Sequence, residues 1–478
     1  ATAAAAAAHA LQCIWEWEGG NALEDYVIGH DIGTGGCKSV LASTQGELVA
    51  SAFEPYPVYH PRNNQAEQDP DDWWRASARA TRDLMAGSGV DPARVIGIGF
   101  AGQMLGVVPV AEDGAPLRRA IIWLDSRADE QAAKLIRRFG GRRVVMRVAG
   151  AIPSGKDVVC KIVWLRENEP EVFHATRFFL DATGYLVYRA TGEMVLDHTG
   201  AGGTGMLGGR KRQWSRLLAE LAGLPLEKMP PISSSIDIMG ALGDDAARVM
   251  GLGSETQVIA GMADIPAAAA GSGALEDGEA HINIGTSSWL CISVSRPRNL
   301  GKYGIAPVVS ADPEMYLMIG ESETAGACLG WFAKNLCRCA DARGPAGEGE
   351  TFRDLDEIAR QVEPGAGRLL FAPWRFGERS PVTDTSIRAA FVNLGLEHKG
   401  EHLLRAVYEG VAYNLRWLLR AVARGRLRAL FCAFKEWRRT LPHEGSTALS
   451  GSIGAAARFT QRLKFDQCRR PAVAVGAG

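Results

Sequence analysis

One short phrase occurs twice in this chain, and it constrains the fold more than any other feature. The copies His30-Asp31-Ile32-Gly33-Thr34-Gly35 and Ile282-Asn283-Ile284-Gly285-Thr286-Ser287 each follow a short apolar run and lead into a second β-rich run. Each copy predicts a strand that delivers a polar side chain, then a Gly-Thr turn whose backbone amides can approach phosphate oxygens. One Gly-Thr pair alone indicates only a turn. Its recurrence after about 250 residues predicts two related halves that hold one nucleotide.

Composition and charge argue against several classes of partner. The chain has 478 residues, of which 46% are apolar, and a formal net charge of −1. These values predict two large or three average domains and give no sign of nucleic acid or membrane binding. No apolar run approaches the roughly 20 residues of a membrane span, and residues 1–8 lack the basic region of a signal peptide. The nine cysteines include no Cys-x-x-Cys pair, which indicates reduced thiols and a cytoplasmic location.

The pattern of apolar residues predicts an α/β fold in which a mixed sheet is covered by helices. In the first half we expect strands at 26–30, 38–42, 47–51 and 95–100, and a helix at 71–85. The second half repeats the scheme, with strands at 281–284, 289–294 and 315–319 and a helix from about residue 325. A helix at 401–424 carries one apolar stripe, made of Leu404, Val407, Val411, Leu415, Leu418 and Val422. Linker candidates at 230–235 and 251–254 predict a domain boundary near residue 255.

An acidic residue follows the expected strand at 258–260. Asp264 precedes Pro266 and the run Ala267 to Ala270, a pattern that predicts a helix beginning near the carboxylate. The dipole of that helix favours the ionised carboxylate, which could accept a proton from a substrate hydroxyl during phosphoryl transfer. A simple helix cap is the alternative interpretation. Asp264 lies about 20 residues before the second Gly-Thr loop, which favours a role as proton acceptor over a role as helix cap.

A series of motifs in this order resembles the FGGY carbohydrate kinases of the actin and hexokinase superfamily. The motifs are Asp31-Ile32-Gly33-Thr34, Glu67-Gln68-Asp69-Pro70 before Trp73-Trp74, Gly102-Gln103-Met104, Trp123-x-Asp125-x-Arg127, Asp264, Gly285-Thr286-Ser287, Gly377-Glu378-Arg379-Ser380-Pro381 and Ala406-Val407-Tyr408-Glu409-Gly410. The resemblance implies a two-domain actin/hexokinase-like (ribonuclease H-like) α/β fold with a cleft between the domains. Residues 25–254 would form the sugar-binding domain and 255–424 an incomplete nucleotide-binding domain. Residues 1–24 would be an unmatched extension and 425–478 an atypical basic tail.

The resemblance also implies a reaction and roles for particular residues. ATP would phosphorylate a sugar hydroxyl, with Asp264 as the general base and Asp31 organising Mg²⁺ and the transferring phosphoryl group. The phosphates would meet the first domain at Gly33, Thr34, Gly35 and Lys38 and the second domain at Gly285 and Thr286. The sugar pocket would be lined by Gln103, Met104, Trp123, Asp125 and Asp264. Without the resemblance, Trp123 and Met104 could be core residues, and Lys38 and Arg127 solvated charges. The expected partner is a small sugar, without nucleic acid or membrane, and a homodimer is compatible with this interpretation.

The motifs are most similar to those of xylulokinases, but one position departs from their pattern. A xylulokinase would have His after Gln-Met, whereas this chain has Leu105, which cannot hydrogen-bond a sugar hydroxyl. Losing that partner changes which hydroxyl pattern the pocket prefers. D-Xylulose is the favoured substrate, and another sugar, a polyol or a sugar acid is the alternative.

The chain after Arg424 departs further from the family pattern. The family continues through a strand into a Gly-rich segment and helix that hold the adenosine, and we expect this chain to lack them. Residues 425–478 contain ten Lys or Arg and three Asp or Glu, which favours a loosely packed basic tail. We therefore expect weak ATP affinity and part of the apolar stripe left uncovered. A catalytically impaired relative, or a nucleotide-driven chaperone or filament protein, are the alternative classes.

Overall fold

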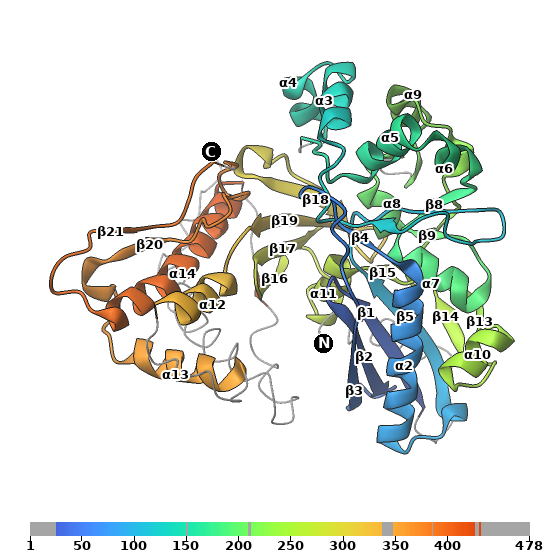
Figure 1. Ribbon diagram of the computed structural model, residues 1–478, viewed down its shortest axis with the longest axis horizontal. Coiled ribbons are helices and arrows are strands. Elements are labelled where there is room, and N and C mark those ends of the chain that lie inside the picture. Colours follow the sequence, from blue (N-terminus) through green and yellow to red (C-terminus); the bar gives the residue numbers. More distant parts are fainter. Residues whose placement is uncertain are drawn as a thin grey trace, which may run out of the picture. The chain divides into compact units, whose positions relative to one another are not determined.

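A mixed sheet of seven strands organises the first half of the chain. Its order is β13-β14-β5-β1-β2-β3, and β15 also pairs with β5 (Figure 1). The strands are β1 (Tyr26–Ile32), β2 (Gly36–Ser43), β3 (Leu48–Pro55), β5 (Val95–Gly102), β13 (Ile238–Ala241), β14 (Gln257–Ile259) and β15 (Met262–Ala263). The first three pair antiparallel in succession, whereas β1, β14 and β15 each pair parallel with β5.

The computed structural model describes residues 25–149, 152–208, 212–336, 348–384, 386–425 and 430–431. Contacts group these residues into two compact units. Unit 1 contains the described residues up to Glu279 together with 292–299 and 306–318, and unit 2 contains 280–291, 300–305 and the described residues from 319 onward. Within these ranges every helix is too short or too polar to cross a lipid bilayer.

Helix α2 (Pro70–Ser88) shows how the local sequence sets an element and buries one face of it. Asp69 accepts a hydrogen bond from the backbone N–H of Asp71 (3.0 Å), Pro70 occupies the first position, and Gly89 ends the helix at φ +68°. Its buried face includes Trp73, which is fully enclosed. The helix packs on β2 and β3 and against α7 (Ala182–Thr191) and α10 (Asp244–Met250).

A second, smaller core of unit 1 is built mainly from short helices. These are α3 (Asp129–Arg138), α5 (Val158–Asn168), α6 (Pro170–Ala175) and α9 (Arg216–Ala222). Helices α4 (Arg142–Ala149) and α8 (His198–Gly203) also belong to unit 1. Short strand pairs join them to the main sheet: β4 (Glu67–Gln68) with β7 (Ala120–Ile121), β6 (Val108–Val110) with β8 (Phe178–Leu180), and β9 (Leu196–Asp197) with β12 (Ile232–Ser233).

The second half of the chain contains a five-stranded sheet and three longer helices. The sheet order is β18-β19-β17-β16-β22, with bounds β16 (Glu279–Ile284), β17 (Ser288–Val294), β18 (Ile305–Val309), β19 (Tyr316–Ser322) and β22 (Leu430–Phe431). The helices are α12 (Gly326–Asn335), α13 (Glu348–Arg360) and α14 (Gly400–Arg424). The short helix α11 (Asp264–Gly271) precedes β16 and belongs to unit 1. Helix α14 packs on α12, α13 and the hairpin of β20 (Leu370–Ala372) and β21 (Ala390–Val392).

The order of elements confirms the α/β expectation, with three differences. Strand β18 was not expected, and the predicted boundary near residue 255 falls within unit 1 because β14 and β15 complete its sheet. The expectation that no family strand follows Arg424 was wrong, since Leu430 and Phe431 pair beside β16. The expected lack of an adenosine segment concerns residues that lie outside the described ranges, as do the rest of the predicted tail and the N-terminal extension.

The apolar stripe of α14 is covered, so the expectation of an exposed stripe was also wrong. Five of its six members are buried: Leu404, Val407, Leu415, Leu418 and Val422. The N-terminal part of this stripe joins the core formed by α12, α13 and Phe371 of β20. Most apolar side chains of the stripe are therefore removed from water within unit 2, which stabilises that unit.

A buried polar cluster joins β1 to α2 directly beneath the first Gly-Thr loop. The imidazole of His30 is fully enclosed, stacks on Phe100, and contacts the hydroxyls of Ser39 (2.6 Å) and Thr81 (3.2 Å). Because Thr81 donates its only hydroxyl proton to the carbonyl of Ser77, Nε2 of His30 is the donor to Thr81 and Nδ1 accepts from Ser39. Burial lowers the pKa of His30 to about 3.

We predict that His30 makes the stability of the protein depend on pH. Between pH 6.5 and pH 3 the unfolded chain protonates this imidazole and the folded protein does not, so stability falls as the pH falls, by up to about 1.4 kcal/mol per pH unit. His30→Asn removes this contribution, which chemical denaturation between pH 4.5 and 7 will measure as a shallower slope. His60→Asn, which removes an exposed imidazole, is the control. Equal slopes for the parent and His30→Asn would contradict the assignment.

Candidate active site

The carboxyl ends of three strands meet at one edge of the first sheet. Ile32 at the end of β1 lies beside Gly102 of β5, and Gly102 lies beside Ala263 of β15. The backbone N–H of Gln103 extends this pairing by donating to the carbonyl of Ile32 (3.0 Å). Because parallel strands end together, the loop after β1, the segment after β5 and Asp264 all leave the sheet at this edge, where α/β proteins commonly bind ligands.

The first Gly-Thr loop has an ordered frame and an exposed tip. Gly33 donates its N–H to the carbonyl of Gly36 (3.1 Å), and the hydroxyl of Tyr56 donates to the carbonyl of Gly33 (2.6 Å). Gly35 is exposed, and so is Lys38. The loop therefore offers backbone amides and a cation of the kind that binds phosphate.

Asp31 lies at the base of this loop, directly across the β1–β2 ladder from Lys38. Burial raises the pKa of Asp31, and the charge of Lys38 acts in the opposite direction. Among the described residues no group of three or more His, Cys, Asp and Glu side chains is arranged to hold a metal ion. A Mg²⁺ that arrives with ATP needs only one or two carboxylates besides the phosphates and water, and the chemistry of Asp31 fits that requirement.

The second Gly-Thr loop is supported by the N-terminus of α12 within unit 2. The backbone N–H of Gly326 donates to the carbonyl of Gly285 (2.8 Å), and those of Ala325 and Ala327 donate to the carbonyl of Thr286 (2.9 and 3.2 Å). A Cβ atom on Gly326 would lie 2.6 Å from the oxygen of Gly285, so only glycine permits this approach. Thr286 remains exposed. Sequence reasoning identified the loop and did not identify Gly326.

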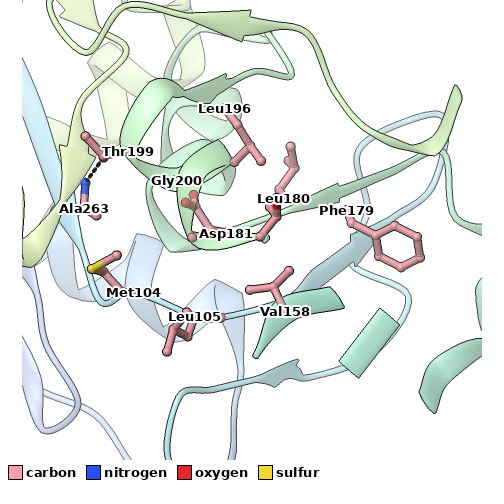
Figure 2. Close-up of a pocket in the computed structure, with 13 residues that line it drawn as sticks. Met104, Leu105, Val158, Phe179, Leu180, Asp181, Leu196, Thr199, Gly200 and Ala263 are labelled. Atoms are coloured by element: carbon pink, nitrogen blue, oxygen red, sulfur yellow. Dashed lines mark hydrogen bonds between the residues drawn. The ribbon is translucent and has the colours of Figure 1, made fainter. Parts of the chain in front are cut away.

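A pocket opens beside the end of β5 (Figure 2). Its lining combines apolar residues such as Met104, Leu105 and Ala263 with the polar side chains of Asp181, Thr199 and Thr204. No Lys or Arg lines it. The cavity encloses about 10 Å³, room for roughly one water molecule, so it would have to widen to admit a sugar.

Asp264 follows Ala263 of the pocket and is the first residue of α11. Its Oδ1 atom accepts a hydrogen bond from the backbone N–H of Ile265 (2.9 Å), and the side chain is half-buried. The expected position of this carboxylate at a helix N-terminus is confirmed. The helix dipole there favours its ionised form.

Two carboxylates at this pocket were missed at the level of sequence: Asp181, which is half-buried, and Asp197, which is buried. Asp181 caps α7 and Asp197 caps α8. Oδ2 of Asp197 accepts from the hydroxyls of Thr199 and Ser235, both at 2.7 Å, and its two oxygens also accept from two backbone amides. A Cβ atom on Gly200 would lie 2.3 Å from Oδ2 of Asp181, so the two caps pack closely. The duplicated phrase Asp-x-Thr-Gly at 181–184 and 197–200 is the sequence signal that could have revealed them.

The two carboxylates have different protonation tendencies. Burial together with the charge of Asp197 raises the pKa of Asp181 to about 7. Burial also raises the pKa of Asp197, whereas the donors around it favour the ionised form. Asp197 orients Thr199, because the hydroxyl that donates to Asp197 accepts from the backbone N–H of Ala263 (2.7 Å; Figure 2). This chain of contacts holds the strand that delivers Asp264.

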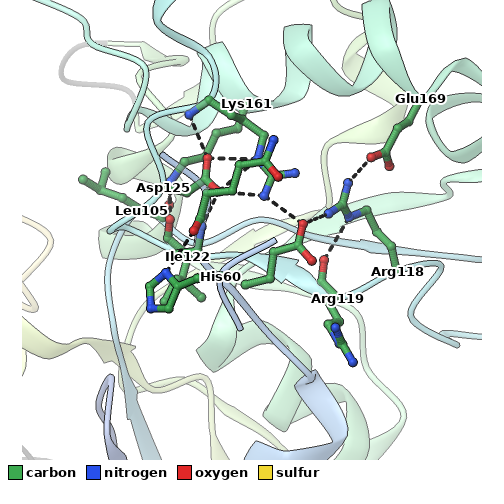
Figure 3. Close-up of polar contacts among 12 residues, drawn as sticks. His60, Leu105, Arg118, Arg119, Ile122, Asp125, Lys161 and Glu169 are labelled. Atoms are coloured by element: carbon green, nitrogen blue, oxygen red, sulfur yellow. Dashed lines mark hydrogen bonds and ion pairs between the residues drawn. The ribbon is translucent and has the colours of Figure 1, made fainter. Parts of the chain in front are cut away.

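Leu105, the position that departs from the xylulokinase pattern, lines the pocket in a strained backbone conformation. Its φ is +61°, which is uncommon for a residue other than glycine. The buried ammonium group of Lys161 on α5 donates to the carbonyls of Leu105 (2.7 Å) and Ile122 (2.9 Å; Figure 3). Burial lowers the pKa of Lys161 to about 7. The sequence signal for this residue was a single cation within the otherwise apolar run 158–165.

Asp125 is fully buried in an ion network. Its carboxylate accepts from the backbone N–H of Ala66 (2.7 Å) and from the guanidinium and backbone of Arg127 (2.7–2.9 Å). Arg127 also binds Glu67 (2.7 Å), which in turn binds Arg118 (Figure 3). Arg127 is therefore not a solvated charge. These contacts occupy both carboxylate oxygens of Asp125, so its direct contact with a sugar stays a prediction.

Trp123 and Gln103 are joined to the first Gly-Thr loop. The indole N–H of Trp123 donates to the hydroxyl of Thr34 (2.8 Å). The amide of Gln103 donates to Gln68 (2.6 Å), whose own amide donates to the carbonyl of Thr34 (2.8 Å). The structure therefore brings the expected sugar residues Gln103, Met104 and Trp123 and the expected phosphate residue Thr34 together in unit 1. Gly285 and Thr286 belong to unit 2.

The fold and these loops define a two-domain sugar kinase of the actin and hexokinase type. The model of the N-terminal domain of the FGGY family of carbohydrate kinases matches residues 26–271, and that of the C-terminal domain matches residues 280–431. The chain belongs to the FGGY family of carbohydrate kinases.

Characterised relatives differ in the substrate that their names state. The chain is 30% identical over 390 residues to the xylulose kinase of Bacillus subtilis (strain 168), covering 82% of this chain and 76% of the relative. It is 28% identical over 397 residues to the gluconokinase of the same strain, covering 82% of this chain and 76% of the gluconokinase. The solved structure of the ligand-bound xylulose kinase from Lactobacillus acidophilus matches with a TM-score of 0.73 at 27% identity, covering 83% of this chain and 78% of that one.

We predict that Asp125 contributes mainly to stability. Asp125→Ala leaves the buried Arg127 with Glu67 as its remaining carboxylate, and breaking a buried ion pair costs about 3–5 kcal/mol. The surface pair of Arg75 and Asp72 provides a control, since Asp72→Ala should cost about 1 kcal/mol or less. Urea denaturation measures both. Equal small losses would show that the network does not stabilise the fold.

Proposed function

We propose that this chain transfers the γ-phosphoryl group of ATP to a hydroxyl of a ketopentose, with D-xylulose as the first candidate. The observation that carries the proposal is Asp264 at the start of α11, directly after Ala263 of the pocket that Met104 and Leu105 line. The resemblance of the chain to proteins named xylulose kinase supports the choice of sugar. The absence of Lys and Arg from the pocket lining favours an uncharged substrate.

Each group has a role that follows from its chemistry. Asp264 would accept the proton of the attacking hydroxyl, because an ionised carboxylate near the acceptor raises its nucleophilicity. The amides of the two Gly-Thr loops and Lys38 would bind phosphate oxygens, and Asp31 would hold Mg²⁺. The metal neutralises charge on the phosphates when it is bound. Met104, Trp123 and Leu105 would exclude water, which competes with the sugar as acceptor.

The second candidate is a kinase for a sugar acid. The gluconokinase of Bacillus subtilis is nearly as similar to this chain as its xylulose kinase, and Leu105 stands where a xylulokinase would have His. A coupled assay of ADP release over ketopentoses, polyols and sugar acids separates the candidates. ADP release that is independent of any sugar would instead support a nucleotide-driven protein without a small acceptor.

We predict that Asp264→Asn lowers turnover by about 10²- to 10⁴-fold, the usual contribution of a positioned general base. Sugar affinity and thermal stability should remain near the parent values, because the amide keeps the shape of the side chain. Turnover with the preferred sugar, measured beside circular dichroism and calorimetric titration, tests this. Asp245→Asn on the surface is the control. Near-parent turnover in folded Asp264→Asn would remove this residue from the mechanism.

Leu105→His should raise kcat/KM for D-xylulose relative to the other sugars that the parent phosphorylates. One added hydrogen bond to a sugar hydroxyl contributes about 1–2 kcal/mol, and histidine tolerates positive φ better than most residues. The measurement is the ranking of substrates by kcat/KM. Leu105→Met, which adds no hydrogen-bonding group, should keep the parent ranking. An unchanged ranking in Leu105→His would mean that position 105 does not contact the sugar.

A further inference from the structure

A buried glutamine connects the sugar segment to the first Gly-Thr loop. Gln68 has no solvent exposure and lies in β4, immediately before α2. Its Oε1 atom accepts from the indole N–H of Trp73 (3.2 Å) and from Nε2 of Gln103 (2.6 Å). Its Nε2 atom donates to the carbonyls of Thr34 (2.8 Å) and Pro57 (3.5 Å).

The orientation of this amide follows from groups that have only one hydrogen-bonding role. The indole N–H of Trp73 can only donate and the carbonyl of Thr34 can only accept. Reversing Gln68 would place a donor against a donor and an acceptor against an acceptor. The oxygen of Gln68 must therefore face Trp73, and its nitrogen must face Thr34.

The fixed orientation of Gln68 fixes Gln103 in turn. Because Gln68 presents an oxygen to Gln103, only the NH₂ group of Gln103 can meet it. The carbonyl oxygen of Gln103 is then left as an acceptor, and it is buried without a hydrogen-bond partner among the described residues. Gln103 is only 3% exposed, so an unsatisfied acceptor there costs about 1–3 kcal/mol unless a ligand satisfies it.

We propose that Gln68 is a positioning residue that makes Gln103 an obligate acceptor for a donor hydroxyl of the substrate. This proposal rests on the proposed function and restricts which substrate group can contact Gln103. That group must be a hydroxyl, because a ketone or carboxylate oxygen cannot donate a hydrogen bond to the Gln103 carbonyl. The same amide holds the carbonyl of Thr34, so one side chain fixes the sugar segment and the phosphate loop together.

Calorimetric titration of D-xylulose without nucleotide tests the proposal, since it requires no catalysis. Gln103→Met removes the acceptor and should weaken binding about tenfold, the value of one hydrogen bond. Gln68→Met lets the amide of Gln103 rotate and should weaken binding by roughly three- to tenfold. The double variant should bind no more weakly than Gln103→Met alone, because Gln68 acts through Gln103.

Two further variants separate positioning from general stabilisation. Gln68→Glu can replace the amide only when it is protonated, because one oxygen then accepts from Trp73 and Gln103 while the O–H donates to the carbonyl of Thr34. Burial favours this neutral form, so sugar affinity should return to within about twofold of the parent at low pH and fall as the pH rises. Gln131 is a matched control, because it is also 3% exposed, donates through Nε2 and has an Oε1 atom without a partner among the described residues. Gln131→Met should leave sugar affinity unchanged. Additive losses in the double variant, or no rescue by Gln68→Glu at low pH, would overturn the proposal.

The orientation of Gln103 is also measurable without a sugar. With ¹⁵N-glutamine labelling, the side-chain NH₂ of Gln103 should exchange slowly in the parent and rapidly in Gln68→Met. Rapid exchange in the parent would overturn the proposal even if Gln68→Met failed to fold. If the parent phosphorylates no sugar but its Gln103 amide is protected, the proposed function fails and the assigned orientation stands.

Discussion

The parallel register of β1, β5 and β15 is the constraint on which the candidate site depends. Ile32, Gly102 and Ala263 lie side by side at the ends of these strands, so three segments that are far apart in the sequence leave the sheet together. Sheet hydrogen bonds set this alignment, and a slip of one residue would turn each following side chain to the opposite face. Backbone pairing therefore sets the positions of the first Gly-Thr loop, Gln103 and Asp264. The side chains then supply the chemistry.

Much of the fold could be read from local patterns. The repeated Gly-Thr phrase, the capped start of α2 and the small residues after Asp264 are signals that a chain carries within a few residues, and each element formed where it was expected. Family motifs added the order of these elements. Short strands such as β15 and β18 were less visible, because two to five residues contain too little periodicity to separate a strand from a loop.

The residues that hold the site together were harder to predict. Asp125, Lys161 and Asp197 each contact a partner 38 to 59 positions away in the sequence, as when Lys161 binds the carbonyl of Ile122. A charged residue in a sequence does not reveal whether it faces water or a carbonyl. Asp125 illustrates this, since its motif suggested a sugar contact and its carboxylate is occupied by Arg127 and Ala66. The strand after Arg424 was missed for a similar reason. Its two residues, Leu430 and Phe431, form too short a run to be recognised as a strand without the partner strand β16.

The left-handed backbone of Leu105 has a consequence for how this site can change over evolutionary time. A residue at this position must first tolerate a φ of +61°, which excludes valine, isoleucine and threonine before their chemistry is considered. Glycine, asparagine, aspartate and histidine remain accessible, and most of them offer hydrogen bonds that leucine lacks. The residues best suited to this backbone are therefore glycine or short polar side chains, so a replacement of Leu105 that eases the backbone would more often add a hydrogen-bonding group to the pocket than another apolar one.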